Sequence, residues 1–280
     1  MPMYFDLDQG KEPNPTLGFL AMMIDPNDYP LPAILLVSLV VILGAGEIGR
    51  WFGARATRYG EDSVSTLEGA ILGLLALMIG FSFAMALSRF EARRDTVLNE
   101  ANAIGTTALR ARLLPAPHNT ESVKLVREYV QLRLDITSRP ASLLDLSAVI
   151  ARSNVLQEAL WQQAKAVAAK DNAMVPTGIF VQSLNEMIDD QGKRLAALHN
   201  RLPIIILIAL YGVATIAVGF AGYASGLQAR HSRLPVYITG ILVASMILLI
   251  QDLDRPSAGF ITVSQQPMID TAASIAAYPD

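Results

Sequence analysis

The chain has 280 residues, of which 52% are hydrophobic and 17% are charged, and its formal net charge is only −3. This composition is too apolar for an ordinary soluble domain, and we expect no nucleic-acid partner. The absence of cysteine excludes disulfides and thiolate chemistry.

The first 28 residues form an acidic, proline-rich tail that begins MPMYFDLDQGKEPNP. A signal peptide needs a positively charged start, so we expect the tail to remain on the mature protein. Its apolar run 16–24, TLGFLAMMI, is too short to cross a bilayer. This run is compatible with an interfacial helix or with packing against the spans of the same chain.

Four stretches without a charged side chain follow in chain order, at 29–46, 69–88, 202–229 and 234–251. About 20 apolar residues cross the hydrocarbon core of a membrane, and backbone groups in lipid must be satisfied within a helix. The sequence therefore predicts an all-α integral membrane protein with four transmembrane helices. The first pair lies within 29–88 and the second pair within 202–251.

More than half of the charged residues lie in the segment 89–201, between the second and third spans. Apolar residues recur there at helical spacing, with breaks at LLPAPHNT, SRPAS and DNAMVPTG. We expect a water-facing domain of about four helices inserted between the two pairs of spans. Its first helix should continue the second span, and its last helix should run into the third.

Residues 252–280 form a C-terminal tail, and the orientation of the whole chain follows from its short loops. The loops after the first and third spans carry Arg50, Arg55, Arg58, Arg230 and Arg233, whereas the two tails are poor in basic residues. The positive-inside rule therefore favours cytoplasmic loops, with both termini and the helical domain outside the cytoplasm.

Catalytic motifs are missing from the sequence. The three histidines, His118, His199 and His231, lack ligand spacing, and no phosphate loop, dinucleotide fingerprint or nucleophile elbow occurs. The glycines of GAGEIG, 44–49, end a span without a preceding strand, which favours helix packing over nucleotide binding. We therefore expect no enzyme, no cofactor and no metal site.

The second span carries two distinct faces. Small residues repeat at three- and four-residue spacing, which favours close helix packing or leaves space along an axis: Gly69, Gly73, Ala76, Gly80 and Ala84. An apolar stripe lies opposite them: Leu74, Leu77, Phe81 and Met85. Around a symmetry axis this stripe would form a hydrophobic constriction, although such stripes also serve as core or lipid contacts.

Charged residues follow both the second and the fourth span. Arg89 and Arg93 share a helix face at the end of the second span, where a repeated helix would present a ring of guanidinium groups that attracts anions. Local pairing and snorkelling are the alternative. After the fourth span, Asp252, Asp254 and Arg255 fall on the same side, so either carboxylate could pair with either arginine.

Three segments together resemble the bestrophin-like family of bacterial membrane proteins. They are 67–115, which contains SRFEARR and EANAIGT, REYVQLRLD at 127–135, and DLDRPSAGFITVSQQP at 252–267. That family is distantly similar to bestrophins, which are pentameric anion channels with a pore neck on the second span. The resemblance implies the bacterial inner membrane, a homo-oligomer and inorganic anions as permeant partners.

The chain also departs from bestrophins. It lacks the acidic calcium clasp of the eukaryotic proteins, and Phe90 alone stands where bacterial bestrophins carry two tryptophans. Bestrophins hold the helical domain in the cytoplasm, whereas the arginine count favours the other side. Either the resemblance is architectural only or the count misleads.

Two functions are compatible with these features. The first is an oligomeric, anion-permeable channel in the lipid bilayer, with the second span lining its pore. The second is a membrane-anchored sensor or scaffold whose helical domain binds a ligand or partner. No kinase, cyclase or long coiled coil follows the spans, which weakens the second hypothesis.

Overall fold

A computed structural model of the chain describes residues 29–56, 61–138, 143–170, 175–227, 232–256 and 259–278. All regular secondary structure in these ranges is α-helical, as the sequence predicts, and they contain no strand. The proposed interfacial segment 16–24 lies outside the described residues.

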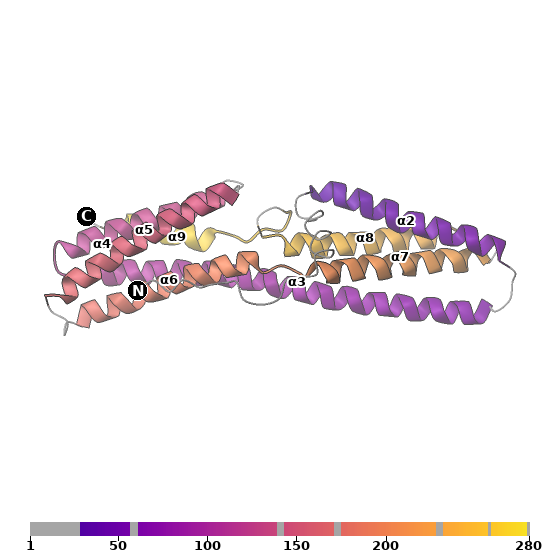
Figure 1. Ribbon diagram of the computed structural model, residues 1–280, viewed down its shortest axis with the longest axis horizontal. Helices are drawn as coiled ribbons and strands as arrows, with labels where there is room; N and C mark the ends of the chain where they lie inside the picture. Colours follow the sequence, from indigo (N-terminus) through magenta and orange to yellow (C-terminus); the bar gives the residue numbers. More distant parts are fainter. Residues whose placement is uncertain are drawn as a thin grey trace, which may run out of the picture. The chain divides into compact units, whose positions relative to one another are not determined.

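The helices follow one another along the chain with short connections (Figure 1). They are α2 (Leu31–Arg55), α3 (Glu61–Ala111), α4 (His118–Ser138), α5 (Leu143–Ala168), α6 (Val175–His199), α7 (Ile204–Leu227), α8 (Leu234–Asp254) and α9 (Gln266–Ala276). The four predicted spans fall in α2, α3, α7 and α8, and the described residues contain four helical stretches long and apolar enough to cross a membrane.

Proline decides where two of the expected long helices end. The second span and the first helix of the charged segment form one helix, α3, which is 51 residues long and ends before Pro115 and Pro117. The predicted continuity from α6 into the third span is wrong, because α6 ends at His199 and α7 begins after Pro203. A proline lacks an N–H group and disfavours helical backbone in the residue before it.

The chain divides into two compact units. Among the described residues, the membrane unit falls within Met1–Ser82 and Pro203–Leu249, and the helical unit falls within Phe83–Leu202 and Ile250–Asp280. Both units therefore combine segments that are distant in the sequence. Helix α3 contributes its first part to the membrane unit and its second part to the helical unit.

Small residues let α2 and α7 approach closely in the membrane unit. A Cβ atom added to Gly49 would clash with the carbonyl oxygen of Gly219, and one added to Gly222 would clash with that of Gly46. An interhelical hydrogen bond between the hydroxyls of Ser38 and Tyr211, at 2.8 Å, adds to this packing. The prediction that GAGEIG serves helix packing is confirmed.

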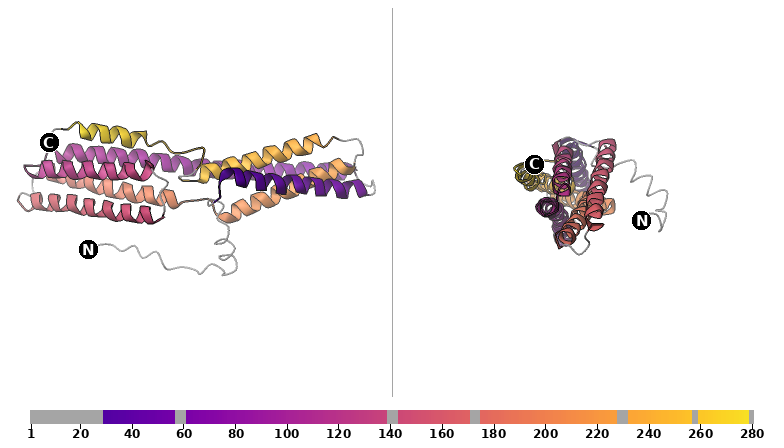
Figure 2. Two further views of the ribbon diagram at one scale, coloured as in Figure 1. Left: turned by 90° about the horizontal axis from the view of Figure 1, so that it is seen from above. Right: turned by 90° about the vertical axis from the view of Figure 1, so that its left-hand side faces the viewer.

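The helical unit is a bundle whose buried core draws on several helices, and α9 lies alongside α4 (Figure 2). Tyr129 of α4 and Phe180 of α6 are fully buried there. The segment 252–280 is more than a tail, because Met268, Ala272 and Ile275 of α9 belong to this core. Their spacing of four and three residues is the helical pattern that could have revealed α9 from the sequence.

Candidate functional site

The apolar stripe of α3 is uncovered within the chain. Leu74, Leu77 and Phe81 are 51%, 55% and 64% exposed, and Met85 is also exposed. Leucine and phenylalanine side chains that are this exposed in a single chain are covered by lipid, are covered by another copy of the chain, or line a hydrophobic constriction.

The small-residue face of α3 is uncovered as well. A Cβ atom added at Gly69, Gly73 or Gly80 would meet nothing within 4 Å, and Ala76 and Ala84 are exposed. The residues of α3 that are buried at this level lie on another side of the helix: Leu75, Ser82 and Ala86. The use of the small-residue face for close packing stays a prediction, and the close contacts seen within the chain belong to α2 and α7.

The two arginines at the charged end of α3 have different surroundings. Arg89 is partly exposed, and its guanidinium donates to Asn200 Oδ1 at 3.4 Å and to the Met85 carbonyl at 3.3 Å. Arg93 is only 2% exposed. Its guanidinium donates to the carbonyl oxygens of Leu253 and Asp254, at the carboxyl end of α8.

The positively charged guanidinium of Arg93 therefore lies at the C-terminal end of α8, where the last carbonyl groups have no hydrogen-bond partner within the helix. Cations are favourable at the C-terminus of a helix because the helix dipole is negative there. Arg93 thus acts as a side-chain cap for α8. An anion-attracting role stays a prediction for both arginines, and of the two only Arg89 keeps an accessible side chain.

The two aspartates that follow the fourth span hold main-chain groups. Both carboxylate oxygens of Asp254 accept from the Leu202 N–H at 3.0 Å. The Asp252 carboxylate accepts from the N–H groups of Phe260 at 2.9 Å and Ile261 at 3.1 Å. Both aspartates are buried, as is Arg255.

The DLDRP segment therefore holds Leu202, in the connection that follows α6, and the turn after α8. An ion pair between the carboxylate of Asp252 or Asp254 and the guanidinium of Arg89 or Arg93 stays a prediction. The observed hydrogen bonds of the Arg93 guanidinium end on carbonyl oxygens of the same segment. Sequence alone does not separate these two arrangements, because both need a carboxylate and an arginine near the end of α8.

A buried charge cluster in the helical unit escaped the sequence analysis. Glu100 of α3 is completely buried and contacts two buried arginines. Arg133 Nε lies 2.7 Å from Glu100 Oε1, and Arg194 Nη1 lies 2.6 Å from Glu100 Oε2. Charged residues on the buried face of an apolar helical pattern are the feature that could have identified this cluster.

Neutral polar side chains extend the cluster. The Tyr129 hydroxyl donates to Gln191 Oε1 at 2.8 Å and lies 3.4 Å from Glu100 Oε1. Gln157 donates to Gln191, and Arg194 donates to Gln265 Oε1 at 3.0 Å. Burial, together with the charge of Glu100, raises the pKa of the Tyr129 phenol above its ordinary value. Tyr129 is therefore a neutral hydrogen-bond donor at physiological pH.

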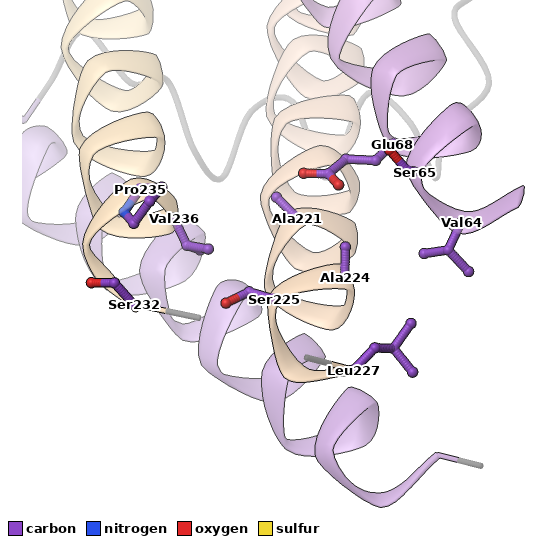
Figure 3. Close-up of a pocket in the computed structure, with 10 residues that line it drawn as sticks. All are labelled: Val64, Ser65, Glu68, Ala221, Ala224, Ser225, Leu227, Ser232, Pro235 and Val236. Atoms are coloured by element: carbon purple, nitrogen blue, oxygen red, sulfur yellow. The ribbon is translucent and has the colours of Figure 1, made fainter. Parts of the chain in front are cut away.

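A pocket of about 250 Å³ opens in the membrane unit among α3, α7 and the start of α8 (Figure 3). Glu68 extends its carboxylate from α3 toward α7, and Ser65, Ser225 and Ser232 supply the other polar groups. The remaining lining is apolar. No group of three potential metal ligands occurs in the part of the chain that the structure describes.

Four apolar helices, an uncovered glycine-rich face and a charged helical bundle define an all-helical, multi-span membrane protein. Residues 35–268 match the Bestrophin-like domain family, so the chain belongs to the bestrophin-like family. No curated protein matches the chain.

Solved structures share this fold at low sequence identity. A structure described as a membrane protein is 14% identical, with a TM-score of 0.65 over 89% of this chain and 99% of that chain. A bacterial bestrophin homologue from Klebsiella pneumoniae is 14% identical, with a TM-score of 0.62 over 89% of this chain and 99% of the homologue. A variant of that homologue is 13% identical, with a TM-score of 0.63 over 86% and 96%.

Proposed function

We propose that the chain assembles into a homo-oligomeric, anion-permeable channel of the bacterial inner membrane, with the first part of α3 lining the pore. The observation that carries this proposal is the exposure of both predicted faces of α3. Only 17% of its most apolar window is buried, against 22% for α2 and 33% for α8. A helix with an exposed glycine-rich face and an exposed apolar stripe suits a position between neighbouring copies and a symmetry axis.

The family relation adds to this proposal. The chain belongs to the bestrophin-like family and shares a fold with bacterial bestrophin homologues. The resemblance implies a pentamer with the second span as the pore neck. In that arrangement the stripe from Leu74 to Met85 would line the narrow part, and dewetting between such side chains would limit conduction.

Arg89 supplies the charge that the proposal needs. It stands at the end of the stripe on the same helix and is partly exposed. A ring of these guanidinium groups would raise the local concentration of anions at one mouth of the pore. Arg93 would support the ring indirectly, since it holds the end of α8 through the carbonyls of Leu253 and Asp254.

The first test is the symmetry of the detergent-solubilised particle, because a monomer cannot form an axial pore. The second test is ion flux in reconstituted vesicles. Phe81→Ala should raise flux, whereas Phe52→Ala, a matched change at an exposed phenylalanine of α2, should not. Arg89→Glu should lower chloride permeability relative to sodium, and the exposed Arg94→Glu is its control. High salt should weaken the Arg89 effect by screening.

Failure of these tests would favour the sensor or scaffold hypothesis. A monomeric particle, or wild-type protein that conducts no ion, would remove the channel proposal. The channel proposal would also be rejected if Phe81→Ala has the ion flux of the wild type and Arg89→Glu has its chloride-to-sodium permeability ratio.

Orientation is part of the proposal and has its own test. Positive-inside counting places the helical unit outside the cytoplasm. Single cysteines introduced at Thr120 and Ser232 should react with an impermeant reagent from opposite faces of the membrane. Labelling of both positions from one face would contradict the four-span topology, and labelling of Thr120 from the cytoplasm would reverse the orientation.

A further inference from the structure

Helices α4 and α5 pack against each other and run in opposite directions (Figure 1). Gln157 Nε2 of α5 donates to the Tyr129 hydroxyl of α4 at 3.4 Å. Arg133 lies one helical turn after Tyr129, and Ser153 lies one turn before Gln157. Because the two helices run in opposite directions, the Tyr129–Gln157 contact predicts that Arg133 and Ser153 face each other one turn further along.

Both of these residues carry buried polar atoms that lack a hydrogen-bond partner within the described residues: Nε and Nη1 of Arg133, and Oγ of Ser153. Arg133 is 1% exposed and Ser153 is fully buried. Buried helical hydroxyls commonly donate to a carbonyl of the preceding turn, as Thr107 does to Ala103 at 2.7 Å. Ser153 makes no such bond, so its hydroxyl remains available to a ligand.

The geometry of the Arg133 guanidinium explains why Nη1 is left over. Its Nε lies 2.7 Å from Glu100 Oε1, and its Nη2 donates to Glu100 Oε2 at 3.3 Å. Both contacts lie along one edge of the planar group, although the Nε contact is an ion pair without hydrogen-bond geometry, and Nη1 lies at the corner away from Glu100. An acceptor for Nη1 must therefore come from elsewhere.

The charges of the cluster also do not balance. Glu100 contributes one negative charge, and the guanidinium groups of Arg133 and Arg194, which both contact it, contribute two positive charges. All three side chains are nearly or fully buried. An uncompensated charge in a low-dielectric interior is costly, and a water molecule would supply a hydrogen-bond acceptor without supplying charge. A monovalent anion supplies both.

We propose that Arg133 Nη1 and Ser153 Oγ bind a small monovalent anion of the halide class inside the helical unit. A halide ion is spherical and carries a single negative charge. It accepts hydrogen bonds from any direction and does not require its donors to lie at fixed angles. The bound ion would neutralise the excess guanidinium charge and join α4 to α5. This site is separate from the proposed pore and does not depend on ion conduction by the protein.

The test is thermal unfolding of the full-length protein in detergent, with chloride replaced stepwise by gluconate at constant ionic strength. Because a ligand that binds only the folded state stabilises it, the transition midpoint should rise with the logarithm of chloride concentration, and bromide should act alike. A midpoint that is the same in both salts would overturn the proposal.

Three variants sharpen this measurement. Ser153→Ala should weaken the apparent halide affinity about tenfold, the effect of one hydrogen bond to an ion. Arg133→Gln should abolish the halide dependence. Arg152→Gln, which removes an exposed arginine of α5, should leave the dependence unchanged. If Arg133→Gln does not fold, the wild-type titration and Ser153→Ala still decide the outcome.

The position of a bound bromide ion can also be located directly, by its anomalous scattering. In crystals grown with bromide, an anomalous difference peak should lie within hydrogen-bonding distance of Arg133 Nη1 and Ser153 Oγ. A peak at neither atom, or full halide dependence in Ser153→Ala and Arg133→Gln, would refute the assignment. A halide-stabilised protein that conducts no ion would contradict the channel proposal and leave this site intact.

Discussion

Removal of the Glu100 carboxylate is the sharpest test of the buried charge cluster. Glu100→Gln keeps the size of the side chain but leaves the guanidinium groups of Arg133 and Arg194 without their common counter-charge. Both pairs have contacts under 3 Å, at 2.7 and 2.6 Å, and side chains no more than 7% exposed. Loss of one partner from such a buried pair costs about 3–5 kcal/mol, because a desolvated charge remains.

The corresponding shift in melting temperature follows from the size of the helical unit. For a domain of about 150 residues, each kcal/mol lowers the midpoint by about 2–4 °C, so we expect a decrease of roughly 6–20 °C. Trp161 packs against the core of the helical unit. A Trp51→Phe background leaves it as the single tryptophan, and its fluorescence then follows the unfolding of this unit.

The matched control is Glu128→Gln on α4. Glu128 pairs with Arg152, but both side chains are about half exposed, so this change should cost less than about 1 kcal/mol. Adding Arg194→Gln to Glu100→Gln should recover part of the lost stability, because one uncompensated charge is removed as well. Equal midpoints for the Glu100 and Glu128 variants would refute the assignment of a stabilising buried cluster.

Three further predictions concern other parts of the molecule. The raised pKa of Tyr129 means that the folded state favours the protonated phenol. The contribution of Tyr129 to stability should therefore be complete below about pH 10, the ordinary pKa of tyrosine, and decrease above it. Tyr129→Phe should remove this alkaline decrease from unfolding midpoints measured between about pH 9 and 11. Gly49→Ala should destabilise the membrane unit, because the added Cβ would clash with the Gly219 carbonyl. Gly73→Ala should leave the monomer intact, because nothing lies within 4 Å of the added Cβ. If the Gly73 face packs between copies, this variant should lower only the oligomer fraction in size-exclusion chromatography. Asp254→Ala should cost about 1–3 kcal/mol by leaving the buried Leu202 N–H without its carboxylate acceptor, and an unchanged midpoint would contradict the anchoring role of Asp254.

The sequence by itself determines the class of the protein. Runs of uncharged residues of bilayer length require helices, because lipid offers no hydrogen bonds to the backbone. The same reasoning predicts a charged helical domain between the second and third spans, and it predicts that α3 passes through both environments. It also identifies GAGEIG as a packing segment, since the glycines end a span where helices can approach.

Tertiary structure decides which polar residues act together. Glu100, Arg133 and Arg194 come from three helices and are adjacent only after those helices pack, so no local spacing reveals their contact. For the same reason, the sequence leaves open whether Arg93 faces a pore mouth or pairs locally, whereas the fold brings its guanidinium to carbonyls far along the chain in α8. Helical periodicity fixes the face on which a side chain lies, but only the packed bundle determines which partner meets that face.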